Sequence, residues 1–384
     1  MTKSKKLTVV TVVGTRPELI KLSRLIPKLD ETFKHIFVHT GQNSDPMLST
    51  VFFKDLSLRF PDVYLEVDNS TLGAMLGDTL RKIESVYFEH KPDAVLVLGD
   101  TNSAISAVLA KRMHIPVYHL EAGNRSFDEN VPEETNRRLI DHVSDFNLPY
   151  TEHARRNLVA EGLHPRRIMV SGSPMREVLE HYRLKIESST VLNDLGLERQ
   201  KYFLVSAHRQ ENVDSEERLN DLLETLRVIH REWGLPLIVS THPRTRKKLA
   251  GIAGHQETEG ITYHEPFGFL DYNKLQLNAK CVITDSGSIA EESTILNFPA
   301  VTIRESLERP EVLDFGGLVM TGLRSDDVLL GIRNAVSRQD DKRLDTGPSY
   351  PQGYEVLDFS SRVLRFMLST ISRHHDWAAI RKLD

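Results

Sequence analysis

The sequence predicts an α/β protein built from two Rossmann-like, doubly wound parallel sheets, one in each half of the chain. At 384 residues the chain is longer than a single hydrophobic core usually supports, so two domains are expected. Short apolar, β-branched runs alternate with helical patterns, which is typical of parallel sheets. The alternation restarts near residue 202, which indicates a second sheet.

In the first half, each predicted strand is followed by a turn and a helical pattern. The strands are predicted at residues 7–13, 36–40, 93–98 and 115–120. The helices are predicted at residues 19–29, 46–56, 71–89 and 103–112. Pro17 lies near the start of the first helix, where proline is favoured. The first sheet is expected to finish near residues 168–174.

In the second half, apolar runs again predict strands. They cover residues 202–207, 235–241, 261–264, 281–284 and 300–303, with a long helix at 216–232. We expect an N-terminal domain over residues 1–175, a C-terminal domain over 176–354, and a polar linker within 180–200. The C-terminal helix, within residues 355–384, is expected to return to the first domain.

Composition narrows the function classes. The formal net charge of -5 argues against a general nucleic-acid binder, and no apolar run is long enough to span a membrane. The single cysteine, Cys281, lies in an apolar strand and is interpreted as a buried structural thiol in a reducing cytoplasm. Metal-ligand spacings, P-loops, G-x-G-x-x-G turns and G-x-S-x-G elbows are not found in the sequence, so neither a metal nor NAD is expected.

One charged stretch, residues 121–138 (EAGNRSFDENVPEETNRR), follows the strand at 115–120. Such a loop is often only a solvated surface segment. This one leaves the carboxyl end of a strand, where open α/β sheets bind ligands. Its carboxylates lie beside arginines, which suits acid/base chemistry on an anionic substrate.

Polar residues follow several predicted strands of both halves. They are Arg16, Asp100, Glu121, His208, His242 and Asp285. Ligands bind at the carboxyl ends of the strands in such sheets, so we expect one active site in a cleft between the two domains. A histidine is more often a packing or surface residue, but two at strand ends beside arginines are candidates for acid catalysis or phosphate binding.

Two turns are candidate phosphate sites. Arg16 at a helix start can meet a phosphate, although residues 14–18 also fit an ordinary turn. The loop 285–288 can bind a diphosphate through amides and hydroxyls, whereas its serines can equally cap the next helix. Arg304 and Arg309 can add positive charge there, or pair with neighbouring glutamates.

Taken together, these motifs resemble the non-hydrolysing UDP-N-acetylglucosamine 2-epimerase family. The matching pieces of the first half are Gly14-Thr-Arg-Pro-Glu18 with Lys21, Gly99-Asp-Thr101, Glu121-Ala-Gly123 with Arg125, and Pro132-Glu-Glu134 with Asn136-Arg137. Those of the second half are His208-Arg209, Asp285-Ser-Gly287 with Glu291-Glu292, and Glu308-Arg-Pro-Glu311. The resemblance implies the two-domain GT-B architecture and a homodimer, with a UDP-sugar as the small-molecule partner.

The resemblance also implies the reaction and its residues. UDP is eliminated across C1–C2 of a 2-acetamido sugar and added back with C2 protonated on the other face. The catalytic positions are matched by Asp100, Glu121, Glu133 and His208. The UDP-binding positions are matched by Arg16, Lys21, Ser286, Gly287, Glu292 and Arg309. Further candidate contacts with the nucleotide sugar are Arg137, His242, Phe267, Tyr272 and Ser288. The sequence does not identify which carboxylate is the base.

Departures from the family pattern concern regulation and substrate. Residues 41–45 (GQNSD) replace the Gln-His-Arg-Glu stretch that helps form a regulatory site in some members, so this allostery is not expected here. Phe267 stands where glutamine is common, and Ser288 replaces a glycine. Four other stretches, at residues 39–43 (HTGQN), 121–128 (EAGNRSFD), 240–246 (STHPRTR) and 268–273 (GFLDYN), are similar to a subgroup of the family. Members of this subgroup make UDP-N-acetyl-L-fucosamine from UDP-2-acetamido-2,6-dideoxy-L-talose, for capsule or O-antigen. The alternatives are a GT-B glycosyltransferase, a hydrolysing 2-epimerase and a UDP-sugar sensor.

Overall fold

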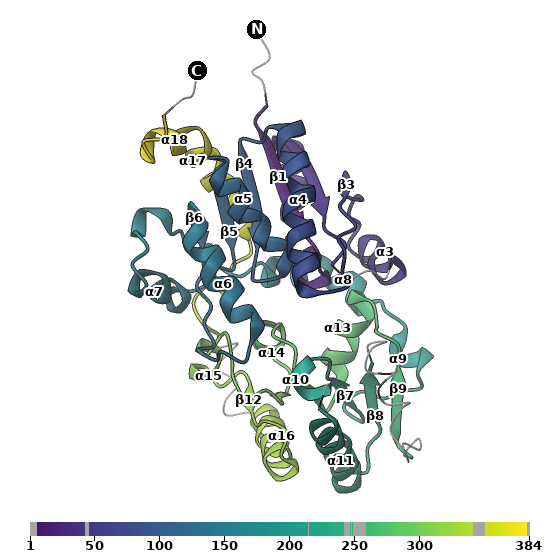
Figure 1. Ribbon diagram of the computed structural model, residues 1–384. Coiled ribbons are helices and arrows are strands. Elements are labelled where there is room, and N and C mark those ends of the chain that lie inside the picture. The colour runs from purple at the N-terminus through teal and green to yellow at the C-terminus, as the bar shows by residue number, and fades with distance from the viewer. Residues whose placement is uncertain are drawn as a thin grey trace. The chain divides into compact units, whose positions relative to one another are not determined.

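A computed structural model describes residues 6–42, 46–213, 215–241, 246, 248, 259–340 and 350–381. The chain divides into two compact units. Unit 1 comprises Met1–Glu180 and Gln352–Asp384, and unit 2 comprises His181–Pro351. Each unit contains one six-stranded sheet whose strand pairs are all parallel, with helices beside it (Figure 1).

The sheet of unit 1 has the order β3-β2-β1-β4-β5-β6. Its strands are β1 (Thr8–Val13), β2 (Lys34–His39), β3 (Val63–Tyr64), β4 (Ala94–Leu98), β5 (Val117–Leu120) and β6 (Phe146–Leu148). The helices are α1 (Arg16–Leu22), α2 (Leu25–Thr32), α3 (Pro46–Asp55), α4 (Leu72–His90), η1 (Asn102–Ile105), α5 (Ser106–Arg112), α6 (Pro132–Val143), α7 (Glu152–Ala160), η2 (Pro165–Arg167), α17 (Phe359–Thr370), η4 (Ile371–Arg373) and α18 (His374–Trp377). Helix α8 (Met175–Glu187) carries the chain into unit 2.

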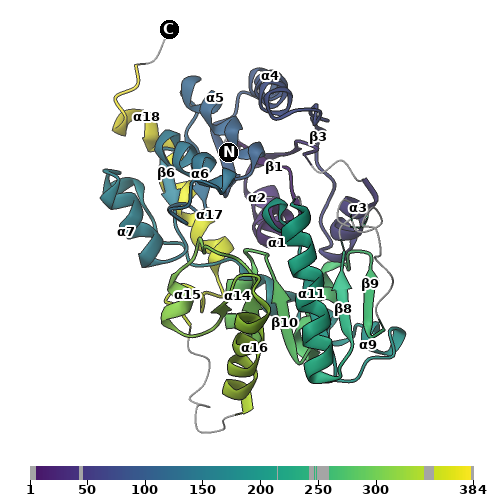
Figure 2. The same cartoon turned by 60° about the horizontal axis from the view of Figure 1, so that its bottom comes forward.

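The sheet of unit 2 has the order β12-β11-β10-β7-β8-β9. Its strands are β7 (Phe203–Ser206), β8 (Leu237–Ser240), β9 (Ile261–His264), β10 (Cys281–Thr284), β11 (Ala300–Thr302) and β12 (Val319–Met320). The helices are α9 (Val191–Asp194), α10 (Gln210–Val213), α11 (Glu216–Trp233), α13 (Phe269–Asn278), α14 (Ile289–Leu296), α15 (Glu311–Asp314) and α16 (Ser325–Asp340). Helices α11 and α16 lie side by side on this sheet (Figure 2).

Both sheets have the same order when their strands are numbered from one within each unit. In each, the first strand lies between the second and the fourth, which is the Rossmann arrangement. The central strands are buried along their whole length because helices cover both faces, and this explains their predominantly apolar sequences. The predicted fold class, two doubly wound parallel sheets, is confirmed.

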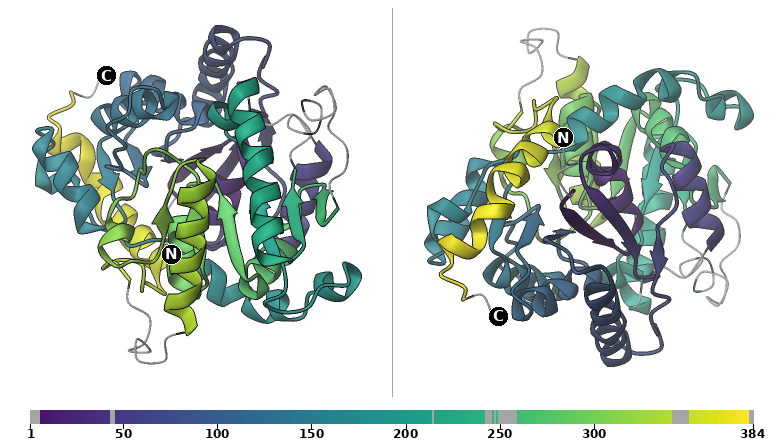
Figure 3. Two further views of the ribbon diagram at one scale, coloured as in Figure 1. Left: turned by 90° about the horizontal axis from the view of Figure 1, so that it is seen from below. Right: turned by 90° about the horizontal axis from the view of Figure 1, so that it is seen from above.

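The C-terminal helix α17 packs in unit 1, beside α2 (Figure 3). Phe366 of α17 contacts Phe146 of β6, with ring centroids 5.5 Å apart. The hydroxyls of Tyr118 and Thr370 lie 2.6 Å apart, and Lys28 of α2 donates a hydrogen bond to Ser361. Among the described residues, no helix has the length and apolar character needed to cross a membrane.

The short outer strands differ from the sequence prediction. Strands β3, β6 and β12 contain two or three residues each, too few to produce a readable pattern. The first sheet ends at β6, and Ile168 of the segment predicted to finish it forms only an isolated bridge to Asn147. Much of the segment expected to be a linker, residues 180–200, is helical in α8 and α9.

Candidate functional site

The turn after β1 places Arg16 and Lys21 on α1. Thr15 and Glu18 form a capping box at the start of this helix, which fixes the direction in which the chain leaves the strand. The Arg16 guanidinium lies 5.6 Å from the centre of the Phe52 ring. Lys21 is buried and forms an ion pair with Glu121. The turn therefore carries two cations at the carboxyl end of β1.

Glu121 directly follows β5 and adopts a left-handed backbone conformation, with φ of 65°. Non-glycine residues rarely adopt this conformation, and its strain is often found at functional sites. The Glu121 carboxylate bonds Lys21 and accepts a hydrogen bond of 3.2 Å from the Tyr150 hydroxyl. Lys21 Nζ also lies 5.8 Å from the centre of the Tyr150 ring. These contacts hold an ionisable carboxyl in one position.

Asp100 follows β4 and is bound by Arg137 of α6 through Nε, at 3.0 Å, and through Nη2. Arg137 is buried and also donates a 2.7 Å hydrogen bond to Glu134. Asn136 of the same helix donates to the backbone oxygen of Asp100. Helix α6 therefore fixes the predicted catalytic Asp100 from two consecutive residues, Asn136 and Arg137.

Glu133 and Glu134 have different environments at the start of α6. Glu134 is 1% exposed and accepts hydrogen bonds from Ser126, Arg137 and Arg138. Burial raises the pKa of Glu134, but the bonds from Ser126 and Arg137 outweigh it and hold the pKa below its ordinary value. Glu133 is partly exposed. Glu134 is therefore a structural anion, whereas Glu133 is open to solvent.

The remaining charges of residues 121–138 are not all solvated. Arg125 is 1% exposed and lies between Asp141 and Glu161, with its Nη1 atom 2.7 Å from Asp141 and its Nη2 atom 2.6 Å from Glu161. His119 of β5 lies 2.9 Å from Asp141 and contacts the Gly99 carbonyl at the same distance. A simple surface loop does not account for this stretch.

In unit 2, His208 and Asp285 lie at the ends of the paired strands β7 and β10. The Asp285 carboxylate accepts the backbone N–H of His208 at 3.0 Å, that of Arg209 at 2.9 Å, and the Asn212 amide at 3.0 Å. The His208 ring lies 3.1 Å from the Ser206 hydroxyl. Asp285 therefore fixes the backbone that presents His208.

The loop after β10 contains Ser286, Gly287 and Ser288. Ser288 occupies the N-cap position of α14, but its side chain makes no capping bond to the helix. The two serine hydroxyls lie 3.1 Å apart, and the Gly287 carbonyl accepts a 2.9 Å hydrogen bond from Arg309. An added Cβ at Gly287 would lie 3.6 Å from Arg309 Nη1, so the loop backbone runs close to this cation.

Further candidates lie around this loop. Glu292 is buried in α14 and accepts a 2.7 Å hydrogen bond from Gln276. Burial raises the pKa of Tyr272, and the nearby Glu292 carboxylate raises it further. The Phe267 ring packs near His264, with centroids 5.5 Å apart. Arg309 lies 3.6 Å from Glu291, so it has an acidic neighbour inside the fold.

Parts of two predictions lie outside the described residues. His242 is one, and Asn43–Asp45 of the stretch compared with the regulatory site is another. Elsewhere, Cys281 is fully buried in β10, and burial raises the pKa of its thiol, as expected of a structural cysteine. Over the described residues, no group of three or more histidine, cysteine, aspartate or glutamate side chains has the arrangement of a metal site.

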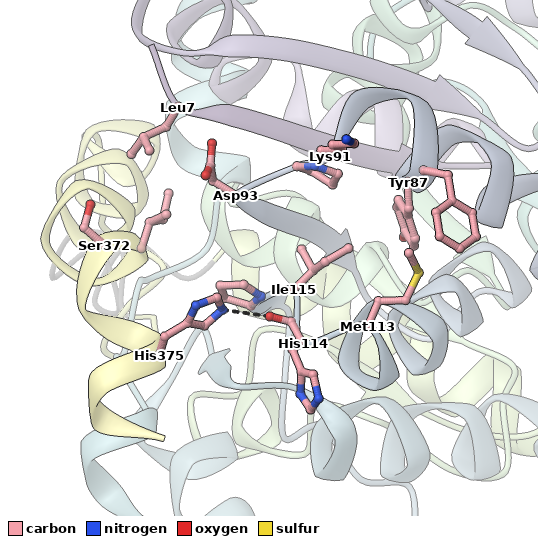
Figure 4. A pocket seen from close by; sticks show the side chains of 13 residues that line it. Leu7, Tyr87, Lys91, Asp93, Met113, His114, Ile115, Ser372 and His375 are labelled. Atoms are coloured by element: carbon pink, nitrogen blue, oxygen red, sulfur yellow. Dashed lines mark hydrogen bonds between the residues drawn. The ribbon is translucent and has the colours of Figure 1, made fainter. Parts of the chain in front are cut away.

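A pocket of about 410 Å³ lies in unit 1 (Figure 4). Its lining includes Leu7, Asp93 and Ile115, which precede β1, β4 and β5, so it opens at the amino ends of these strands. His375 contacts the His114 backbone oxygen there at 2.9 Å. The candidate residues follow the carboxyl ends of the same strands, so this pocket does not contain them.

Sequence reasoning missed the positions of Tyr150 and the bonds of Glu18. Tyr150 follows β6, a strand too short to be predicted. Glu18 was included in a motif without a role, although Thr15-Arg-Pro-Glu18 matches the S/T-x-x-E capping-box pattern. That pattern could have identified the Thr15–Glu18 contact, but not the contact with Thr101.

Comparisons with known proteins place this geometry in a family. The family model described as UDP-N-acetylglucosamine 2-epimerase matches residues 27–367. The structure of UDP-N-acetylglucosamine 2-epimerase from Rickettsia bellii is 43% identical, with a TM-score of 0.90, and covers 98% of this chain and 100% of that chain. The Methanocaldococcus jannaschii UDP-GlcNAc 2-epimerase in complex with UDP-GlcNAc and UDP is 33% identical, with a TM-score of 0.87, over 94% of this chain and 100% of that chain.

A relative with a different substrate name is also similar. It is UDP-2,3-diacetamido-2,3-dideoxy-D-glucuronate 2-epimerase of Pseudomonas aeruginosa, 35% identical over 88% of this chain and 95% of that protein. All of these proteins are named as 2-epimerases of UDP-linked acetamido sugars, and the matches extend over both units. The chain belongs to the UDP-N-acetylglucosamine 2-epimerase family and is an isomerase.

Proposed function

We propose that the protein inverts C2 of a UDP-linked 2-acetamido sugar by eliminating UDP and adding it back, without hydrolysis. The observation that carries this proposal is the gathering of Asp100 and Glu121 after the neighbouring strands β4 and β5, with Glu133 at the start of α6. Such carboxyl groups can exchange protons with a carbon centre. Lys21 and Arg137 contact two of them and can stabilise negative charge.

The proposed reaction has two balanced steps. A carboxylate takes the proton from C2 while the C1–O bond breaks, and the bonding electrons leave with UDP. The product is a 2-acetamidoglucal. In the second step UDP oxygen attacks C1, and a carboxylic acid delivers a proton to the opposite face of C2. The base and the acid are drawn from Asp100, Glu121 and Glu133, and the chemistry needs no cofactor.

The leaving UDP requires positive charge and hydrogen-bond donors. We assign the diphosphate to Arg16, Lys21, His208, Arg309 and the loop of Ser286, Gly287 and Ser288. Arg309 already lies against this loop through its bond to the Gly287 carbonyl. The buried Glu292 carboxylate can accept hydrogen bonds from the hydroxyl groups of the ribose. Tyr272, Phe267 and His242 are assigned to the nucleotide sugar by resemblance alone.

For the substrate, we propose UDP-2-acetamido-2,6-dideoxy-L-talose, with UDP-N-acetyl-L-fucosamine as the product. Phe127 and Phe267 support this choice, because an aromatic ring can accept a methyl group at C6 where a polar residue would instead bind a hydroxyl. The Phe127 side chain is 69% exposed, and the Arg138 guanidinium lies 5.9 Å from its ring centre. The role in capsule or O-antigen synthesis is part of this proposal.

The test is proton NMR in deuterated water with purified protein and no acceptor. UDP-2-acetamido-2,6-dideoxy-L-talose and UDP-N-acetylglucosamine are supplied separately. We expect deuterium at C2 and the epimer as product, faster with the 6-deoxy sugar. Exchange with UDP-N-acetylglucosamine alone would overturn the substrate proposal and leave the reaction intact.

Other outcomes would overturn the reaction itself. Free N-acetylmannosamine with UDP would indicate a hydrolysing epimerase. Binding without exchange would favour a glycosyltransferase or a UDP-sugar sensor. Glu121→Gln provides the control, since it should abolish exchange while UDP binding, measured by calorimetry, remains.

We also propose that the enzyme is a homodimer of the cytoplasm. The family resemblance supports the homodimer, and the single, buried cysteine supports the cytoplasmic location. Light scattering at micromolar concentration tests the dimer, and a monomeric mass would contradict it. Fractionation of the source cells tests the compartment, and recovery outside the cytoplasmic fraction would contradict it.

A further inference from the structure

In each sheet the first and fourth strands are neighbours. From the first strand the chain continues to the second strand toward one edge of the sheet, and from the fourth strand it continues to the fifth toward the other edge. In such sheets the point between these strands is where ligands bind. In unit 1 it lies between the turns after β1 and β4, and in unit 2 between the turns after β7 and β10. Both points are crossed by one buried carboxylate, Glu18 in unit 1 and Asp285 in unit 2.

Glu18 forms four hydrogen bonds that reach both turns of unit 1. Its Oε2 atom accepts the N–H of Gly14 at 3.0 Å, the N–H of Thr15 at 2.8 Å and the Thr15 hydroxyl at 2.8 Å. Its Oε1 atom accepts the Thr101 hydroxyl at 3.1 Å. The next residue after Thr15 is Arg16, and the residue before Thr101 is Asp100. The Glu18 side chain therefore bonds the residue next to Arg16 and the residue next to Asp100.

The turn after β1 has no spare room in which to shift. A Cβ added to Gly14 would lie 1.9 Å from the Ser103 hydroxyl and 2.3 Å from the Thr40 hydroxyl. These hydroxyls bond each other at 2.8 Å and close the space beside the turn. Glu18 holds the turn from the α1 side, and the Ser103 and Thr40 hydroxyls close the space on the other side. The backbone of the turn is therefore fixed from two directions.

Resting on the proposed function, we propose that Glu18 is a positioning residue that keeps the turn bearing Arg16 and the turn bearing Asp100 in register with each other. Glu18 is 1% exposed and acts through its neighbours. Displacing a reacting group by about 1 Å can cost about a hundredfold in rate. The rate gained from a fixed spacing between a phosphate-binding arginine and a catalytic carboxylate therefore offsets the cost of burying an acidic side chain.

The bonds of Glu18 indicate what holds the two turns. The donors of these four bonds are neutral groups. Burial, only partly offset by these bonds, raises the pKa of Glu18 from 4.5 to about 7. Glutamine can reproduce the geometry, because its oxygen can accept the three bonds at Oε2 and its amide can donate to the Thr101 hydroxyl. Glu18→Gln should therefore keep both links, Thr101→Val should lose only the link to the second turn, and Glu18→Ala should lose both.

The experiment measures kcat, KM and calorimetric UDP binding for these three variants, with the melting temperature as a check of folding. The matched control is Glu177→Ala. The Glu177 carboxylate also accepts a backbone N–H and a hydroxyl, both from Ser360 of α17, and it links two helices instead of two strand ends. The control should keep kcat and KM within about twofold.

We expect Thr101→Val to lower kcat about tenfold or more with KM and UDP affinity unchanged, because Arg16 remains held. Glu18→Ala should lower kcat at least as much and weaken UDP binding about fivefold or more, and Glu18→Gln should stay within about threefold of the unmodified protein. Unchanged kcat and KM in folded Glu18→Ala, or a loss in Glu18→Gln as large as in Glu18→Ala, would overturn the proposal.

Failure of the proposed function gives a different result. In that case the unmodified protein does not exchange the C2 hydrogen at all. UDP binding then decides the positioning role: weaker binding in Glu18→Ala than in Thr101→Val supports it, and equal binding overturns it.

Discussion

Removing either partner of the Lys21–Glu121 ion pair should destabilise unit 1 strongly. The two side chains are 7% and 9% exposed, so neither charge is well solvated once its partner is lost. Breaking a buried pair by removing one member typically costs about 3–5 kcal/mol. We expect Lys21→Met and Glu121→Gln each to lower the unfolding free energy of unit 1 by about 3 kcal/mol.

The double variant, Lys21→Met with Glu121→Gln, separates the interaction energy of the pair from the other effects of each substitution. Replacing both charges leaves no unpaired ion, so the loss should be smaller than the sum of the two single losses by about 2 kcal/mol. Tyr150→Phe is the matched control. It removes only the hydroxyl that donates to Glu121 at 3.2 Å and should cost about 1 kcal/mol.

Urea unfolding followed by tryptophan fluorescence measures these losses. The chain has two tryptophans, Trp233 in unit 2 and Trp377 in unit 1, so a Trp233→Phe background leaves one reporter in the unit of interest. The Arg166 guanidinium lies 4.1 Å from the Trp377 ring centre, a contact that unfolding removes. Single losses that add within about 0.5 kcal/mol in the double variant would refute the reasoning.

Three further predictions concern Glu18, Gly14 and Cys281. The pKa of Glu18 is raised from 4.5 to about 7 by burial, so its stabilising contribution is complete below pH 4.5 and about 3 kcal/mol is lost as the pH rises through 7. Glu18→Gln should abolish that pH dependence of urea unfolding, and an unchanged dependence would contradict the assignment. Gly14→Ala should cost about 1–3 kcal/mol in the same measurement because its Cβ has no room, whereas Gly77→Ala, with nothing within 4 Å, should be neutral or stabilising; equal effects would be evidence against this packing. The buried thiol of Cys281 should react with a disulfide reagent only in urea, and rapid labelling of the folded protein would show otherwise.

The sequence predicted the sheets well because their central strands are buried on both faces. A β-branched, predominantly apolar run such as residues 8–13 has few alternatives to a parallel strand once a glycine turn and a helix follow. The short edge strands β3, β6 and β12 were not predicted, since two or three residues cannot establish a period, whereas the four-residue edge strand β9 was predicted. Val63–Tyr64 is an example, because only its pairing with β2 identifies it as a strand.

For the candidate site, the sequence located residues but not their bonds. Strand ends pointed to Asp100, Glu121 and His208 because the carboxyl edge of a parallel sheet collects polar side chains. Their partners depend on segments far apart in the chain. Arg137 reaches Asp100 across 37 positions and Tyr150 reaches Glu121 across 29. Spacing in one sequence does not encode such contacts, so they required the fold.

The two buried carboxylates distinguish the turns after β1 and β7 from the glycine-rich turn of a dinucleotide site. In that turn, free backbone amides at a helix start bind the diphosphate. Here the amides of Gly14 and Thr15 donate to Glu18, and those of His208 and Arg209 donate to Asp285.

A backbone amide has a single N–H, so an amide that already donates to a carboxylate is a poor ligand for a second anion. The proposed UDP contacts at these two turns must therefore come from side chains, Arg16 after β1 and His208 after β7. Because a side chain can change rotamer when UDP departs and returns whereas a clamped turn cannot, the arrangement suits a reaction in which the nucleotide is both leaving group and nucleophile.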